Sequence, residues 1–304
     1  MSTVMEKTST EDGAIAAFET RYIQHIRRQR LFTLVGLAIL GALLMWSFSV
    51  SEVFSGDRGG DPLARLATFL DKLMPDLEPR SLLSDVETEG SLANWFYGWP
   101  LWFSALWETL QIAIVSSVLG AILAVPAAIL ASRNLMPIAS VRFVTRRILE
   151  AIRTLPDIIV ALILVAAFGI GPLAGVITIV LSTIGRLGKL YAEINESADM
   201  GPLRSVRASG GNWWHALRYG LAPQVAPGYA SYALLKLEGN IGAAAALGIV
   251  GAGGIGIELS RAITYTLFAD YLAILLMITV LIFVTDMLSE QVRHQLIGVK
   301  SGYV

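Results

Sequence analysis

Residue patterns that could carry nucleotide chemistry are few in this sequence. The segment Gly251–Gly256 matches G-x-G-x-x-G, with which a strand–turn–helix unit binds dinucleotide phosphates. Neither a strand before this segment nor a βαβ unit around it is expected, so we predict a flexible, tightly packed loop instead. Gly188-Lys189 is similar to the end of an ATP-binding phosphate loop, but Leu190 replaces the required Ser or Thr. Thr183 also stands where the first glycine of that loop belongs, so no nucleotide site is predicted.

Metal and covalent chemistry are also unsupported. The chain has no cysteine, which excludes disulfides, thiolate metal sites and cysteine nucleophiles. Its three histidines, His25, His215 and His294, are scattered along the sequence. An intramembrane enzyme would need a set such as H-E-x-x-H or a Ser/His pair within spans, and neither is evident. We therefore expect no catalytic residue, no metal site and no cofactor in this chain.

The composition indicates a membrane protein. Hydrophobic residues make up 55% of the 304 residues, charged residues 15%, and the mean hydropathy is +0.62. So little charge cannot cover the molecule with water-facing side chains, and the apolar excess must face lipid. The 23 basic and 24 acidic residues nearly cancel, which gives no reason to expect a nucleic-acid partner.

About six apolar stretches are long enough to cross a bilayer as helices. The first, 31–50, contains no charged residue and follows a polar tail over 1–30. A cleaved signal peptide is the alternative interpretation of that stretch. The others are about 107–131, 143–168, 173–192, 223–250 and 267–289. The sequence thus predicts an all-α, polytopic membrane protein with about six transmembrane helices.

The connection over 51–104 is expected outside the cytoplasm. Apolar residues at helical spacing from Pro62 to Leu73 predict a short helix on the membrane surface. An aromatic cluster follows, made of Trp95, Phe96, Tyr97, Trp99, Trp102, Phe103 and Trp107. Such rings favour the level of the lipid headgroups, and packing against another loop is the alternative.

Basic residues in the polar connections predict the orientation. If the spans alternate, they all fall on one side of the membrane: Arg27, Arg28, Arg30, Arg133, Arg142, Arg146, Arg147, Arg204, Arg207, Arg218, Arg293 and Lys300. The positive-inside rule makes that side cytoplasmic. Both termini, including a tail over 293–304, are therefore expected in the cytoplasm.

The longest cytoplasmic connection between spans, 193–222, carries clear turn signals. Pro202 marks a helix start, Gly210 and Gly211 mark a helix stop, and Pro223 begins the next span. These signals predict two short helices around a glycine turn, which would form a compact docking element. An ordinary surface loop is the alternative.

This connection resembles the coupling loop of ABC importer permeases, whose pattern is E-A-A-x-x-x-G, nine residues, then I-x-L-P. Ala208, Gly210 and Pro223, thirteen residues after that glycine, fit the pattern, whereas 204–206 depart from its acidic and alanine positions. The resemblance implies that this loop contacts an ATPase. The residues it assigns to that contact are Arg204, Arg207, Ala208, Ser209, Gly210, Gly211, Trp213, Trp214 and Pro223.

Further segments extend the resemblance to roughly 100–295. Residues 108–113, 126–134 and 153–156 look like the transmembrane domain of this superfamily. Residues 185–193, 207–210 and 242–256 look specifically like phosphonate importer permeases. The implied fold is a type I ABC importer transmembrane domain over 105–292.

The implied function is the permease subunit of an ATP-driven importer for phosphonate or a related small phosphorus oxyanion. A homodimer in the bacterial plasma (inner) membrane is expected, because one such set of helices is a half-pore. The implied partners are a cytoplasmic ABC ATPase, which would use ATP and Mg, and an extracytoplasmic phosphonate-binding protein. The alternatives are an ABC permease for another small solute and an ion-gradient-driven transporter.

Ionisable residues inside spans are costly and are functional candidates by default. Glu150, Arg153 and Asp157 are spaced three and four apart, so one helix face would carry a local ion network.

The translocation-pathway candidates are Lys236, Glu238 and Asn240. Lys236 and Glu238 are two residues apart and so lie on different helix faces. Lys236 would attract an anion or else pair with a carboxylate of a neighbouring helix. Glu238 is the best cation-site candidate for the ion-gradient alternative.

Overall fold

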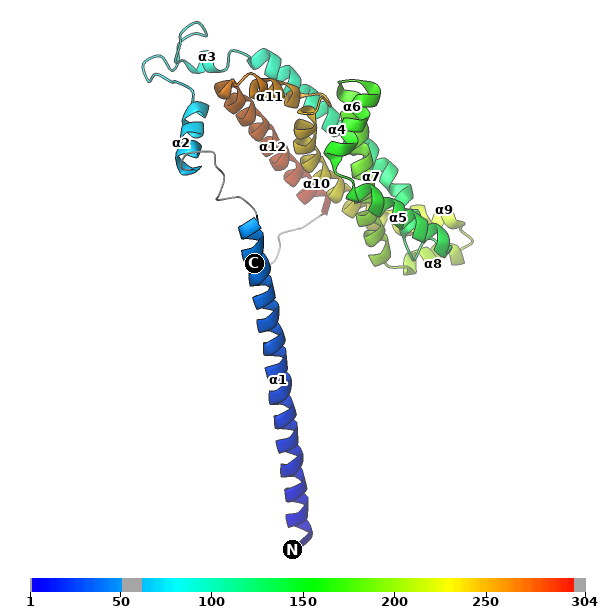
Figure 1. Ribbon diagram of the computed structural model, residues 1–304. Coiled ribbons are helices and arrows are strands. Elements are labelled where there is room, and N and C mark those ends of the chain that lie inside the picture. The colour runs from blue at the N-terminus through cyan, green and yellow to red at the C-terminus, as the bar shows by residue number, and fades with distance from the viewer. Residues whose placement is uncertain (1, 51–61, 298–304) are drawn as a thin grey trace. The chain divides into compact units, whose positions relative to one another are not determined.

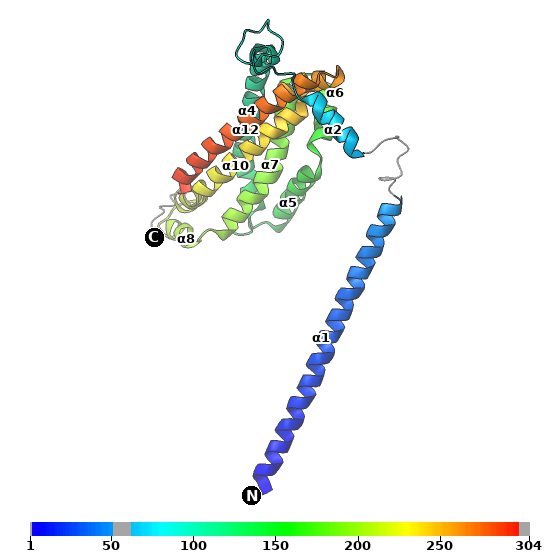
Figure 2. The same cartoon turned by 90° about the vertical axis from the view of Figure 1, so that its left-hand side faces the viewer.

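The computed structural model describes residues 2–50 and 62–297, and every regular element within them is helical (Figures 1 and 2). The chain divides into two compact units, residues 1–67 and 68–304. The all-α prediction is therefore confirmed over the described ranges.

The first unit contains one long helix, α1 (Ser2–Val50). The expected polar tail is helical and continues without a break into the first predicted span. The part from His25 to Val50 is long and apolar enough to cross a membrane. A second helix, α2 (Pro62–Leu73), begins in this unit and has the predicted bounds.

Four long helices run alongside one another in the second unit: α4 (Trp99–Ala131), α7 (Pro172–Ser197), α10 (Ala222–Gly248) and α12 (Phe268–Ile297) (Figures 1 and 2). Small residues let α4 and α7 approach closely. A Cβ added to Gly120 would lie 2.6 Å from the Cβ of Thr183. Helices in lipid gain no hydrophobic driving force from each other and rely on such close packing.

The predicted span 143–168 is wrong as a single helix. It consists of α5 (Ala139–Thr154) and α6 (Asp157–Phe168), which are bent by 86° at the break between them. Pro156 causes the break, because a proline disfavours helical geometry in the residue before it, and Leu155 has an extended ψ of 127°.

The number of spans depends on this bent pair and on α10. Four helices are long and apolar enough to cross a membrane, and the bent pair makes up to five. Helix α10 is the remaining predicted span and has 27 residues, but it is not among these apolar helices. Its sequence includes Lys236, Glu238 and Asn240, so it fits a position inside an assembly better than one surrounded by lipid.

Part of the aromatic cluster packs against another segment, and the position of the exposed rings at the lipid headgroups stays a prediction. It begins at α3 (Leu92–Trp95), where the Trp95 Nε1–H donates to the carbonyl of Ala269 at 2.9 Å, while Trp102 is buried. The Tyr97 hydroxyl donates to Asp270 at 2.8 Å, and this hydrogen bond is the main cause that raises the pKa of Tyr97. By contrast, Trp107 is 54% exposed, and Trp99 and Phe103 are exposed to a similar degree.

The glycine loop at 251–256 is tightly packed, as predicted. It joins α10 to α11 (Ile255–Thr264) and follows a helix, whereas a dinucleotide site needs a strand there. A Cβ on Gly253, whose φ is +91°, would lie 2.8 Å from the Cα of Pro172. The Ile255 N–H donates to the Thr109 hydroxyl at 2.8 Å, which ties the loop to α4.

Candidate functional site

The segment 201–222 has helices on both sides of a glycine turn, as predicted, but the second helix does not end before the next span. Helix α8 (Gly201–Ala208) is followed by α9 (Trp213–His215), which continues through the π-helical stretch η1 (Ala216–Leu221) into α10 without a break. Gly210 has a φ of +85°, in the left-handed region that favours glycine. The Gly211 N–H donates to the carbonyl of Val206 at 3.0 Å and closes the end of α8.

The base of this segment is packed against the bundle. A Cβ on Gly220 would lie 2.9 Å from the Cα of Leu203, so α8 and η1 are in backbone contact. Gln224 also clamps Asp199, since its Nε2 donates to the Asp199 carbonyl at 3.0 Å and its Oε1 accepts from the Asp199 N–H at 3.1 Å. The segment is therefore held in one position relative to α10.

The outer side of the segment is cationic and aromatic. We define the docking surface as its exposed large side chains: Arg204, Arg207, Trp213, Trp214, Arg218 and Tyr219. Trp214 is 69% exposed and Tyr219 62% exposed. The arginines of the docking surface form no ion pair with any described residue. Ala208, Ser209, Gly210 and Pro223 are also exposed, whereas Gly211 is half-buried.

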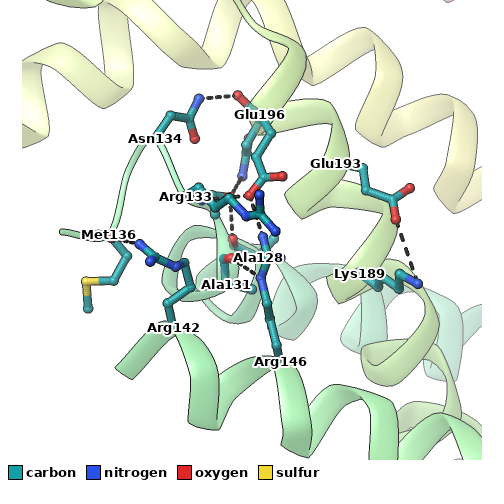
Figure 3. A network of polar contacts seen from close by, with 12 residues as sticks. Ala128, Ala131, Arg133, Asn134, Met136, Arg142, Arg146, Lys189, Glu193 and Glu196 are labelled. Atoms are coloured by element: carbon teal, nitrogen blue, oxygen red, sulfur yellow. Dashed lines mark hydrogen bonds and ion pairs between the residues drawn. The ribbon is translucent and has the colours of Figure 1, made fainter. Parts of the chain in front are cut away.

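A polar network beside this segment ties α4, α5 and α7 together (Figure 3). Arg146 of α5 forms an ion pair with Glu196 of α7, and its Nε donates to the Ala131 carbonyl at 2.8 Å. The Arg133 N–H donates to Glu196 at 2.7 Å. From the sequence, Arg133 and Arg146 served only to predict the orientation, and Glu196 was not identified as their partner. Arg146 and Glu196 are 50 residues apart in the chain, so no local spacing relates them.

A stacked tyrosine pair continues this network toward α10. The rings of Tyr191 and Tyr229 stack with centroids 3.9 Å apart. The Tyr229 hydroxyl donates to Asn195 Oδ1 at 2.7 Å, and Asn195 Nδ2 donates to Ser132 at 3.1 Å. A displacement of the loop after α7 would therefore be transmitted through these contacts to the ends of α4 and α10.

A pocket of about 140 Å³ opens next to the network. It is lined by Ala131, Arg146, Leu149, Glu150, Lys189, Ala192, Glu193 and Glu196. The charges in it are mixed, and the described residues contain no metal-binding group of three or more His, Cys, Asp or Glu. Lys189 and Glu193, which both line it, form an ion pair of 3.9 Å along α7.

The ion network predicted for Glu150, Arg153 and Asp157 on one helix face is wrong. The break at Pro156 separates Asp157 from the other two residues. Glu150 pairs with Arg147 at 2.5 Å, whereas Asp157 pairs with Arg186 of α7 at 3.2 Å. Sequence reasoning missed Arg186, whose signal was a charge inside the apolar stretch 173–192.

Lys236 and Glu238 lie on different faces of α10, as predicted. Lys236 is within electrostatic range of Arg186 and Asp157, and Glu238 faces Asp286 of α12. No described residue forms an ion pair with Lys236. Their roles in translocation stay predictions.

Asn240 is placed differently from the other two pathway candidates. It is fully buried, and its Nδ2 donates to Ser117 at 2.8 Å and to Thr183 at 3.0 Å. The side chain therefore ties α4, α7 and α10 together, and its role in translocation stays a prediction.

Comparison with known proteins complements this geometry. Residues 117–296 match the family described as "Binding-protein-dependent transport system inner membrane component". The chain is 36% identical over 195 residues to the "Phosphate-import permease protein PhnE" of Mycolicibacterium smegmatis. The aligned region covers 64% of this chain and 37% of that protein. It is 33% identical over 222 residues to the "Phosphite transport system permease protein PtxC" of Stutzerimonas stutzeri. That alignment covers 71% of this chain and 81% of the relative.

Solved structures have a similar fold. A chain of the MetNI methionine ABC transporter in an inward-facing conformation superposes with a TM-score of 0.56 at 21% identity, which covers 64% of this chain and 96% of that one. A chain of an amino acid ABC transporter gives a TM-score of 0.56 at 18% identity, covering 66% and 97%. At these identities the likeness bears on the fold alone.

Proposed function

The chain belongs to the binding-protein-dependent inner membrane components, the permease subunits of ABC importers, and we propose that it imports phosphonate or a related small phosphorus oxyanion. Its relatives are named for phosphate, phosphite and phosphonate transport, which share a small tetrahedral phosphorus anion. The permease performs no covalent chemistry in this proposal. ATP and Mg are used by a partner ATPase.

The observation that carries the proposal is the docking surface on its rigid base. Trp, Tyr and Arg are the residues that most often dominate the energy of a protein interface. Here they project from a segment whose backbone is fixed by Gly220 and by the Gln224 clamp. We assign the docking surface to a cytoplasmic ABC ATPase, and the ATPase would offer it carboxylates and an apolar cleft.

The network of Figure 3 supplies a route from docking to the bundle. The loop between α7 and α8 follows Glu196, which holds Arg146 of α5. A shift of the docked segment would therefore act on α5, and through the break at Pro156 on α6. ATP binding and hydrolysis would in this way bias an equilibrium between inward-open and outward-open states.

A homodimer in the plasma (inner) membrane completes the assembly, with both termini in the cytoplasm and a binding protein on the outer side. Arg186, with a side chain 41% exposed, lies in the middle of α7. Such a charge is costly against lipid. A second copy facing it would enclose it in an aqueous pathway.

Removal of one exposed tryptophan tests the docking assignment. Trp214→Ala should lower the amount of ATPase that co-purifies with the permease, because Trp214 is 69% exposed and stabilises nothing within the chain's core. Trp107→Ala is the matched control, since Trp107 is 54% exposed on α4. Equal ATPase recovery with both variants and the wild type, at equal membrane abundance, would place the ATPase elsewhere.

One observation favours the ion-gradient alternative enough to test it. Glu238 of α10 faces Asp286 of α12, and carboxylates that meet between spans are typical of proton pathways. An ion-gradient transporter would stop when a protonophore collapses the gradient. The proposed importer would instead stop when ATP is removed.

A further inference from the structure

Three helices that pack on one another, α6, α7 and α10, carry charged side chains within electrostatic range of one another. Asp157 begins α6, Arg186 lies on α7 and Lys236 lies on α10. Arg186 and Lys236 are near the midpoints of helices of 26 and 27 residues, so each lies roughly 15–20 Å from either helix end at 1.5 Å per residue. We call Asp157, Arg186 and Lys236 the charged cluster.

The charged cluster contains more positive than negative charge. Asp157 is engaged by Arg186 at 3.2 Å and accepts from the Ser182 hydroxyl at 3.3 Å. Lys236 has no ion pair and no side-chain hydrogen bond among the described residues, although both other members lie within its electrostatic range. Two cations and one carboxylate leave one uncompensated positive charge deep in the membrane part.

Space is available beside these cations. The side chain of Arg186 is 41% exposed, and that of Asp157 is 24% exposed. Gly239 follows Lys236 by one turn of α10, and a Cβ built on it would have no neighbour within 4 Å. The charged cluster therefore lies on an open face of the bundle, where an uncompensated charge requires water or an anion.

We propose that Arg186 and Lys236 bind the transported phosphorus oxyanion, and that Asp157 occupies Arg186 when no anion is present. This assignment rests on the proposed import function and names its membrane site. A guanidinium offers two parallel N–H donors that match two oxygens of a tetrahedral anion, and an ammonium adds a point charge.

Competition by Asp157 has a functional consequence. A transported solute must bind well enough to enter the site and weakly enough to leave it. The carboxylate of Asp157 replaces the anion on Arg186, so release does not leave the guanidinium unpaired. Asp157 begins α6 and Arg186 lies on α7, so the competing carboxylate and the arginine are on separate helices.

Charge removal in the reconstituted complex tests this site. Arg186→Gln and Lys236→Gln should each lower ATP-driven phosphite uptake into proteoliposomes by about tenfold, because each removes a charge-assisted contact. The control Arg147→Gln removes an arginine that pairs with Glu150 at 2.5 Å on α5. It should leave uptake unchanged, and all three variants should retain the ATPase.

Phosphite titration separates a binding site from a merely structural ion pair. Phosphite should raise the unfolding temperature of the purified complex, and Arg186→Gln should abolish that shift. Asp157→Asn should produce the shift at a severalfold lower phosphite concentration, because the competitor is gone. A structural ion pair predicts instead that Asp157→Asn and Arg186→Gln lose stability alike, with no change in phosphite dependence. If Arg186→Gln does not insert, Arg186→Lys keeps the charge and loses only the paired donors, and it should still lower phosphite uptake severalfold.

The possible failures are distinguishable. Wild-type uptake and wild-type phosphite stabilisation in both Arg186→Gln and Lys236→Gln would overturn the site and leave the import function standing. Absence of phosphite, phosphate and methylphosphonate uptake by the wild-type complex would overturn the import function itself.

Discussion

Asn240 connects three helices through its side-chain amide. Its Nδ2 donates to Ser117 of α4 and to Thr183 of α7, and all three side chains are buried. Interhelical hydrogen bonds in membranes contribute less than their isolated strength, because the reference state also finds partners. Asn240 therefore fixes the relative positions of α4, α7 and α10 at a modest gain in stability.

Replacement of Asn240 by leucine tests this structural assignment. We expect Asn240→Leu to lower the free energy of unfolding by about 1–2 kcal/mol, because two hydrogen bonds are lost. The loss is kept small because Oδ1 of Asn240 has no donor among the described residues. Thermal unfolding of the purified complex measures the change, with the exposed Gln111→Leu of α4 as control. A tenfold loss of uptake per folded complex would instead show that Asn240 acts in the translocation pathway.

Gly256 permits the closest approach between α10 and α11. A Cβ at Gly256 would lie 2.1 Å from the carbonyl oxygen of Ala245 and 2.6 Å from the Cα of Gly248. Backbone atoms on both sides cannot yield as a flexible side chain can. We expect Gly256→Ala to destabilise the protein by about 1–3 kcal/mol or more.

The control for this variant is Gly242→Ala on α10, whose added Cβ would meet nothing closer than 4.0 Å. The amount of monodisperse protein recovered from membranes and its unfolding temperature report the difference. Equal recovery of the two alanine variants would contradict the packing described for the glycine loop.

At the scale of elements, the docking segment combines local signals that act independently. Gly210 has a φ of +85°, and a Cβ on Gly211 would lie 2.7 Å from the carbonyl oxygen of Val206. A side chain at a positive φ costs roughly 1–2 kcal/mol, and valine adds a second branch. The two glycines thus determine the angle between α8 and α9.

We expect the double variant Gly210→Val, Gly211→Val to misdirect the docking surface. ATPase recovery and uptake should both fall, whereas the membrane abundance of the permease should not. The double variant Gly36→Val, Gly41→Val in α1 is the matched control, because neither glycine has a neighbour within 4 Å of a built Cβ. Wild-type ATPase recovery and uptake in the docking variant would mean that 193–222 is an ordinary surface loop.

Elements whose signals are local were predictable from the sequence. Pro62, Pro202 and Pro223 each stand within the first two residues of a helix, so helix starts were readable. The break at Pro156 carried the same local signal, but prolines are tolerated inside spans, as Pro126 and Pro227 are here. Nothing local to Pro156 distinguishes a bend of 86° from such a tolerated proline.

Contacts between distant segments were not predictable. The ion pairs of Arg146 with Glu196 and of Arg186 with Asp157 join different helices. Spacing along one helix suggested partners only within that helix, which produced the wrong network for Glu150 and Asp157. The burial of Asn240 was not predictable for the same reason, because it depends on three helices together.

At the scale of the whole molecule, the distribution of arginines predicts the orientation in the membrane. We expect a reporter that is active only in the cytoplasm to be active after Lys300 and silent when inserted near Glu89. The physical reason is that basic flanks are retained on the cytoplasmic side during insertion. The opposite activity at either position would change the span count or the orientation.

The proposed import function belongs to an assembly, because the half-pore, the docking surface and the charged cluster would each need a partner. A second copy of the permease would enclose Arg186 and Lys236 in water. An ATPase on the docking surface would supply the energy, and a binding protein would supply the solute. We therefore predict transport only when all of these parts are present together.

Uptake of phosphite into proteoliposomes tests the proposed import function. The liposomes would contain the permease and its ATPase, with ATP and Mg on the ATPase side and the binding protein on the other side. We predict uptake that requires ATP, the ATPase and the binding protein, and that persists when a protonophore is added. Uptake by the permease alone, or uptake abolished by the protonophore while ATP is present, would contradict the account.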